Sequence, residues 1–141
     1  MRSIFFGFLF LHFFCACNQN NDVSISASEN DADAARNFIQ AALEGDYKRA
    51  KQFVVPDSIN QQYIELLQRN YESRMSPENK KGYKEASINI HSVQGINDSV
   101  SIIQYSNSYK KQRDSIKAVR IDNKWLIDLK YSFPSITNTN E

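Results

Sequence analysis

The spacing of apolar residues changes once along this chain, and that change limits the class of fold that it can adopt. Between residues 31 and 82, apolar side chains recur every three or four residues, as on one face of an α-helix. From Tyr83 onward they recur every second residue, as in strands with one buried face. Helices followed by strands predict an α+β fold, with N-terminal helices packed on one face of a curved antiparallel four-stranded sheet.

Polar residues suited to helix capping stand before each of four helical segments. The predicted caps are Asn30 or Asp31, Asp46, Asp57 or Ser58, and Ser76. Gly45 is expected to end the first helix, because glycine adopts the left-handed conformation at little cost. Pro56 stops the second helix. Gly82 closes the fourth segment, which is short enough to be only a turn.

The strands that follow are predicted at residues 86–90, 100–109, 116–121 and 124–131. Asp122-Asn123 joins the last two strands as a two-residue hairpin turn, since both residue types tolerate a positive backbone angle. Trp125, Ile127 and Leu129 share one face of the last strand. Alternation therefore places Asp128 on the opposite face, in contact with solvent.

Two segments resemble a known family of domains. The stretch from Asn37 to Tyr47, followed by Ala50 and Phe53, is similar to the helix-Gly-Asp-helix opening of nuclear-transport-factor-2-like domains. The ending from Ile121 to Asp128 resembles their closing hairpin. The resemblance covers about residues 31–131. More specifically, the chain looks like small uncharacterised bacterial lipoproteins related to putative lumazine-binding proteins. It implies a cone-shaped domain whose helices cover the concave side of the sheet and leave a pocket at the wide end.

The first 17 residues are typical of a targeting segment. Arg2 precedes an apolar run over residues 4–14, and Cys17 is followed by polar residues. A membrane-spanning helix needs about 20 apolar residues, so this run suits a cleavable signal better. Ala16-Cys17 resembles the lipobox of bacterial lipoproteins, which implies that Cys17 is lipidated. An ordinary secretory signal and an uncleaved short anchor stay open as alternatives.

These assignments divide the chain into a lipoprotein signal peptide (1–16), the lipidated Cys17 with a flexible tether (17–29), the folded domain (30–134) and a polar tail (135–141). The leader contains one charged residue, Arg2, so the mature chain has 16 basic and 16 acidic residues. That balance gives no electrostatic footprint for nucleic acid. Processing leaves no free thiol, which excludes disulfides and cysteine-based metal sites. The asparagine-rich tether and tail resemble the Bacteroidetes group in composition.

A small set of side chains is predicted for the pocket. Tyr63, Tyr105 and Trp125 are expected to line it, since aromatic residues with a polar tip suit pocket walls. Asp128 would join them, as the best candidate for a general base, only if the faces of the sheet are reversed. His91 is the only mature histidine and is predicted on the polar side of its strand. One histidine without neighbouring ligands predicts no metal site, and no catalytic residue or cofactor is predicted.

The predicted function is that of a lipid-anchored, non-catalytic binding or scaffolding domain of the bacterial cell envelope, with an unidentified ligand. The alternatives are an isomerase- or hydrolase-like enzyme that uses the cone pocket, and a structural partner of another envelope protein. The predicted partner is membrane lipid, which the protein contacts through acylated Cys17. Because Asn18 rather than aspartate follows Cys17, outer-membrane delivery is favoured over retention at the inner membrane.

Overall fold

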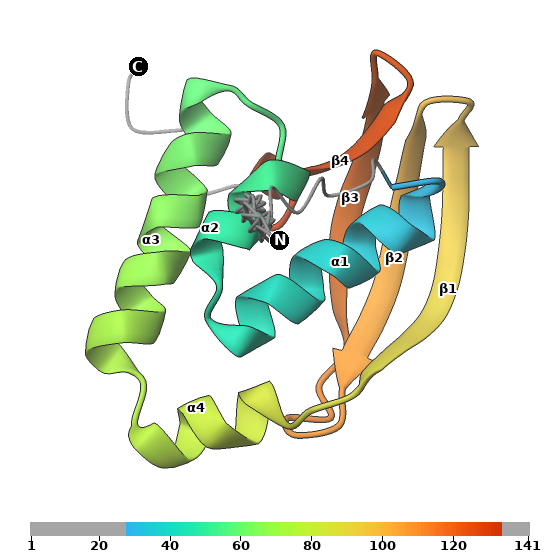
Figure 1. Cartoon of the computed structure of the whole chain (residues 1–141). Helices are drawn as coiled ribbons and strands as arrows, with labels where there is room; N and C mark the ends of the chain where they lie inside the picture. Colours follow the sequence, from blue (N-terminus) through green and yellow to red (C-terminus); the bar gives the residue numbers. More distant parts are fainter. Residues whose placement is uncertain (1–27, 134–141) are drawn as a thin grey trace, which may run out of the picture.

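The computed structural model describes residues 28–133, so Cys17, the predicted leader and the polar tail lie outside the described part. Within it, helices come first and the sheet second (Figure 1). The helices are α1 (Asp31–Glu44), α2 (Tyr47–Ala50), η1 (Lys51–Phe53), α3 (Ser58–Arg74), α4 (Pro77–Lys84) and η2 (Leu129–Tyr131). The strands are β1 (Ile88–Asn97), β2 (Val100–Asn107), β3 (Asp114–Ile121) and β4 (Lys124–Asp128). The predicted α+β class is confirmed.

The four strands form one antiparallel sheet in the order β1-β2-β3-β4. Register shifts in β1 fall between Ile90 and Ser92 and between Gly95 and Asn97. Such bulges increase the local twist and bend the strand. At the opposite edge, Val54 forms a parallel bridge with Ile127, and the N–H of Val55 donates to the Ile127 carbonyl at 3.0 Å. The segment before α3 therefore covers part of the β4 edge.

The helices lie on one face of this sheet. α1 crosses the sheet diagonally, and α4 occupies the end of the fold where β1 begins (Figure 1). The core forms where small residues of α1 meet branched side chains of the strands, so that helix and sheet approach closely. Its buried members include Ala34, Ala35, Phe38, Ile39, Ala41, Tyr63, Ile64, Ile103, Ile116, Ala118 and Ile127.

The capping predictions are confirmed. Side-chain oxygens of Asn30, Asp46, Asp57 and Ser76 each accept a hydrogen bond from the backbone N–H three residues later. Gly45 ends α1 with a φ of 77°, in the left-handed region. Asp122 and Asn123 both have positive φ values, as the predicted hairpin turn requires. These local conformations follow from short stretches of sequence alone.

Several predicted boundaries are wrong. The first strand runs from Ile88 to Asn97 instead of ending at residue 90. The last strand ends at Asp128 instead of continuing to Tyr131, because the chain turns there into η2. Gly82 lies inside α4 and does not close it. The glycine is explained by a long-range contact, since a Cβ at Gly82 would overlap the ring of Tyr109. Hydrophobic periodicity does not report such a contact, because Tyr109 is 27 positions further along the chain.

Asn60 joins the start of α3 to the end of β4. It has no exposed surface, and its Oδ1 accepts a hydrogen bond from the Leu129 N–H at 2.7 Å. Its Nδ2 donates to Asp57 Oδ2 at 2.9 Å and to Asp128 Oδ1 at 3.2 Å. Lys130 Nζ lies 2.6 Å from Asp57 Oδ2. This network fixes the first turn of α3 against the sheet.

The predicted solvent exposure of Asp128 is wrong, since only 8% of the residue is exposed. The alternation itself holds, because Asp128 pairs with Lys117 across the strands and so lies on the opposite face from Ile127. Lys117 Nζ lies 3.3 Å from Asp128 Oδ2, and Lys130 Nζ lies 3.6 Å from Oδ1. Asn60 and these two lysines cover a carboxylate that alternation alone would leave open.

Replacing Gly45 by alanine is expected to destabilise the fold. Alanine in the left-handed conformation costs about 1–2 kcal/mol, and the added Cβ would also overlap the ring of Tyr71. The Tm of Gly45→Ala should therefore fall by several degrees in a thermal unfolding experiment. Gly95→Ala is the matched control, because nothing lies within 4 Å of a Cβ at that position. Equal Tm values for the two variants would contradict the explanation.

The acid stability of the fold should depend on Asp57. The N–H of Asn60 and the ammonium group of Lys130 lower the pKa of Asp57 from 3.8 to about 2. A depressed pKa in the folded state stabilises the fold above about pH 4, and that stabilisation is lost as the pH falls towards 2. Asp57→Asn keeps a capping oxygen but cannot titrate. The Tm of the wild type should therefore fall more steeply from pH 4 to pH 2 than that of Asp57→Asn, and parallel curves would disprove this.

Candidate functional site

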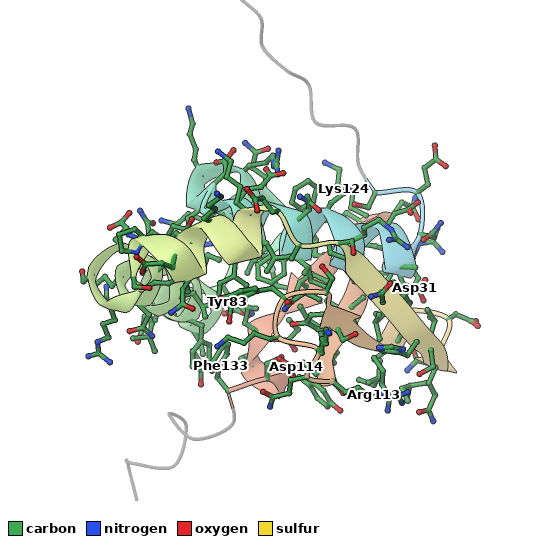
Figure 2. All side chains as sticks on the ribbon, turned by 90° about the horizontal axis from the view of Figure 1, so that it is seen from below. Asp31, Tyr83, Arg113, Asp114, Lys124 and Phe133 are labelled. Carbon is green, nitrogen blue, oxygen red and sulfur yellow. The ribbon has the colours of Figure 1, made fainter. Side chains whose placement is uncertain are left out.

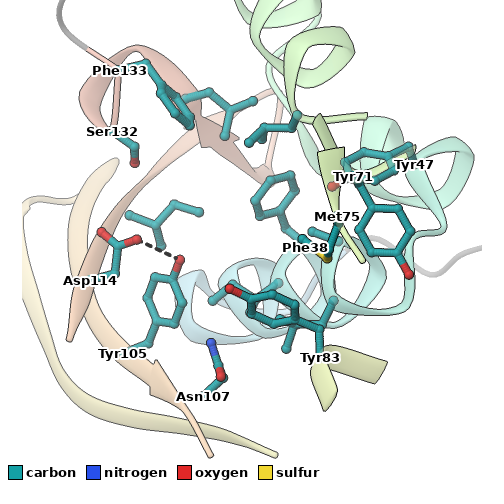
Figure 3. Close-up of a pocket in the computed structure, with 16 residues that line it drawn as sticks. Phe38, Tyr47, Tyr71, Met75, Tyr83, Tyr105, Asn107, Asp114, Ser132 and Phe133 are labelled. Atoms are coloured by element: carbon teal, nitrogen blue, oxygen red, sulfur yellow. Dashed lines mark hydrogen bonds between the residues drawn. The ribbon is translucent and has the colours of Figure 1, made fainter. Parts of the chain in front are cut away.

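A cavity of about 270 Å³ lies between α1, the second half of α3 and the inner face of β2 and β3. We call it the inner cavity. α1 supplies a continuous apolar wall of Phe38, Ile39, Ala42 and Leu43. Figure 3 shows Phe38 near the middle of the cavity, with residues of the sheet on one side and of the helices on the other. An apolar space of this kind is where a small molecule can replace water favourably.

The sheet side of the inner cavity carries a polar pair. The Tyr105 hydroxyl donates a hydrogen bond to Asp114 Oδ2 at 3.4 Å (Figure 3). The two residues are direct partners across β2 and β3. Burial raises the pKa of Tyr105 above its ordinary value of 10, and the nearby charge of Asp114 raises it further. Tyr105 therefore keeps its proton at neutral pH and acts as a hydrogen-bond donor, not as a base.

Three tyrosines also line the helix side of the inner cavity. Tyr47 and Tyr71 pack edge to face with ring centres 5.7 Å apart. Burial raises the pKa of Tyr47 to about 12, with smaller contributions from Tyr71 and Glu72. Tyr83 of α4 also lines the cavity. Viewed from the α4 end of the fold, it lies between the helices and the strands (Figure 2). These rings give the cavity a wall that is apolar over most of its area.

A second, more open cavity of about 350 Å³ adjoins the first, and we call it the outer cavity. The two cavities share part of their lining, namely Tyr47, Leu67, Tyr71, Met75 and Tyr83. The residues found only in the outer cavity are all polar or charged: Asn70, Arg74, Asn79 and Lys110. The site therefore changes from apolar to polar across one shared wall.

Tyr109 holds the β2–β3 connection against α4. Its hydroxyl donates to Asn79 Oδ1 at 2.7 Å, and its ring packs edge to face on Tyr83 with centres 5.2 Å apart. The absence of a side chain at Gly82 makes room for the ring. Lys110 Nζ lies 5.7 Å from the centre of the same ring. This contact brings a basic residue of a long connection to the outer cavity.

The aromatic residues predicted for the pocket are separated in the structure. Tyr105 lines the inner cavity, whereas Tyr63 and Trp125 do not. Tyr63 is buried beside the cavity, where its ring stacks on Phe133 and its hydroxyl donates to the Phe133 carbonyl at 2.5 Å. Trp125 is half-buried and packs against the core. Tyr63 thus supports the cavity wall through Phe133, which does line it.

Neither ionisable candidate lines the inner cavity. Asp128 lies in the Asn60 network at the start of α3, where its two oxygens already face Asn60 and the two lysines. His91 is exposed on β1, with Nε2 2.8 Å from the Ser106 hydroxyl. The carboxylate that reaches the cavity is that of Asp114. Asp114 lies opposite Tyr105 across β2 and β3. The sequence alone does not give this strand register, and so it does not identify Asp114 as a cavity residue.

Residues 28–133 contain no group of three or more His, Cys, Asp or Glu side chains placed to hold a metal ion. In the same part of the chain, none of the helices combines the length and the apolar character needed to cross a membrane.

No family model matches the chain, and no curated protein matches it. Among solved structures, the chain is similar to an NTF-2 like protein of unknown function from Shewanella oneidensis MR-1, with 12% sequence identity and a TM-score of 0.47. The match covers 68% of this chain and 89% of that one.

Proposed function

We propose that this chain is a lipid-anchored binding domain of the bacterial cell envelope, and that its inner cavity takes a small, mostly apolar molecule. The observation that carries the binding part is the largely apolar and aromatic lining of that cavity, with a few polar side chains, such as Tyr105, Asn107 and Asp114, on its sheet side. Ligand sites in proteins combine an apolar lining with few polar groups in this way.

The lining supports binding better than acid–base catalysis. A general base needs a pKa near the working pH and must lie within hydrogen-bond reach of the substrate. Tyr105 stays protonated, and Asp114 is exposed at the cavity edge with Oδ2 already accepting from Tyr105. The enzyme alternative with Asp128 as base would require that residue in the cavity, and it lies in the network with Asn60 instead.

The anchoring part rests on the sequence around Cys17. An apolar run that is too short to span a membrane, then Ala16-Cys17 and a polar stretch, is the order expected of a lipoprotein signal. Each buried methylene of an attached lipid contributes about 0.8 kcal/mol, so two or three acyl chains hold a domain firmly at a bilayer. We propose the outer membrane as the site of attachment, since Asn18 follows the cysteine.

Naphthalene tests the binding function, because it is apolar and of suitable size. An engineered apolar cavity of about 150 Å³ holds benzene, so the inner cavity has room for roughly ten carbons. We expect the wild type to bind naphthalene, and Ala42→Leu, which fills the cavity from α1, to bind it at least about tenfold more weakly. Affinities would be measured by titration calorimetry on residues 18–141.

Ala32→Leu is the matched control for that experiment. It makes the same change on the same helix, at a position that does not line the cavity. Both variants should keep a cooperative thermal transition, since leucine is a good helix former. The binding function is excluded if the wild type does not bind naphthalene, or if Ala42→Leu binds it as tightly as Ala32→Leu does.

Lipidation is tested by Cys17→Ser in a native host. Without a thiol to acylate, the protein should either stay unprocessed or leave the membrane fraction, which fractionation and intact mass would show. Cys15→Ser is the control, because Cys15 precedes the proposed cleavage site and should leave with the signal. A Cys17→Ser product of mature size that remains in the membrane fraction would argue against the anchor.

A further inference from the structure

We propose that the ligand is an amphipathic anion, with an apolar body of roughly ten carbons in the inner cavity and a carboxylate at Arg74 and Lys110 in the outer cavity. This inference rests on the proposed binding function and adds the chemical class and the orientation of the ligand. It is carried by the juxtaposition of two cavities of different character across one shared wall.

The two cavities differ in polarity and share five lining residues. The inner one is bounded by apolar side chains of α1, and the outer one by amide and cationic side chains of α3, α4 and the β2–β3 connection. The shared wall includes Met75, whose unbranched side chain adapts easily to a bound molecule. A ligand with a single apolar or polar character would fit only one of the two spaces.

The outer cavity is rich in positive charge. Arg74 and Lys110 line it, and Lys80 Nζ lies 5.3 Å from the centre of the Tyr71 ring, which also lines it. Within residues 28–133, neither Arg74 nor Lys110 takes part in a salt bridge. Glu72 stands two residues before Arg74 on α3, and its Oε1 accepts from Gln68 Nε2 at 2.8 Å. The cationic groups of Arg74 and Lys110 thus remain available to an anion.

The charges also fix the direction in which such a ligand lies. Asp114 stands at the sheet side of the inner cavity and would repel a carboxylate placed there. Arg74 and Lys110 stand on the other side of the shared wall and would attract it. The apolar end therefore points towards Tyr105 and the sheet, and the charged end towards α4.

The position of Lys110 is built into the fold. Lys110 follows Tyr109, which is held by its hydrogen bond to Asn79 and by its packing on Tyr83. The Lys110 N–H also donates to Asn107 Oδ1 at 2.8 Å, and the next residue, Lys111, has a positive φ of 58°. An exposed connection would otherwise be free to move its basic residue away from the cavity.

Decanoate and 1-decanol test the inference as a matched pair, because they share a ten-carbon body and differ in the charge of the head. By titration calorimetry at low salt, we expect decanoate to bind at least about tenfold more tightly than decanol. Added salt should weaken decanoate alone. The variant Arg74→Gln/Lys110→Gln should reduce decanoate affinity to that of decanol and leave decanol affinity unchanged.

The control is Arg120→Gln/Lys124→Gln, which removes two exposed positive charges from the β3–β4 hairpin, outside both cavities. It should retain the preference for decanoate. Equal binding of decanoate and decanol by the wild type, or a preference that survives Arg74→Gln/Lys110→Gln, overturns the inference and leaves the binding function intact. If the wild type does not bind naphthalene, the binding function fails and the inference falls with it.

Discussion

The buried amide of Asn60 is the interaction on which the arrangement of the helices depends. Each of its polar atoms has a partner: the Leu129 N–H on one side, and carboxylates of Asp57 and Asp128 on the other. A buried polar group left without a partner costs about 1–3 kcal/mol, so this residue specifies one position of α3 against the sheet. The cavities lie further along the same helix, and their width follows from that position.

The sequence predicts the elements of this fold well where the signal is local. Asp46 and Asp57 are recognisable as caps from the helical segments that follow them, and Gly45 from the apolar stripe that it ends. Asp122-Asn123 defines its hairpin by itself. The wrong predictions concern long-range contacts. Gly82 accommodates Tyr109, and Asp128 is covered by Asn60, 68 positions earlier in the chain.

The candidate site is less predictable than the fold for the same reason. Tyr105 lines the inner cavity, but nothing in the alternation of β2 distinguishes it from a tyrosine at the rim of a core. Predicting Asp114 requires the register of β2 on β3, and predicting Lys110 requires the contact of Tyr109 with α4. A site assembled from several helices and strands becomes visible only when their relative positions are known.

Tyr71 links the stability of the fold to the shape of the site. Its ring lines both cavities and packs on Tyr47, and it lies where a side chain at Gly45 would otherwise extend. Protein interiors are close-packed, so a ring displaced at one contact moves into the nearest free space. A displaced Tyr71 ring would therefore move into one of the two cavities that it lines. The glycine that ends α1 is therefore also a condition for an open cavity, and helix termination and ligand access depend on the same residue.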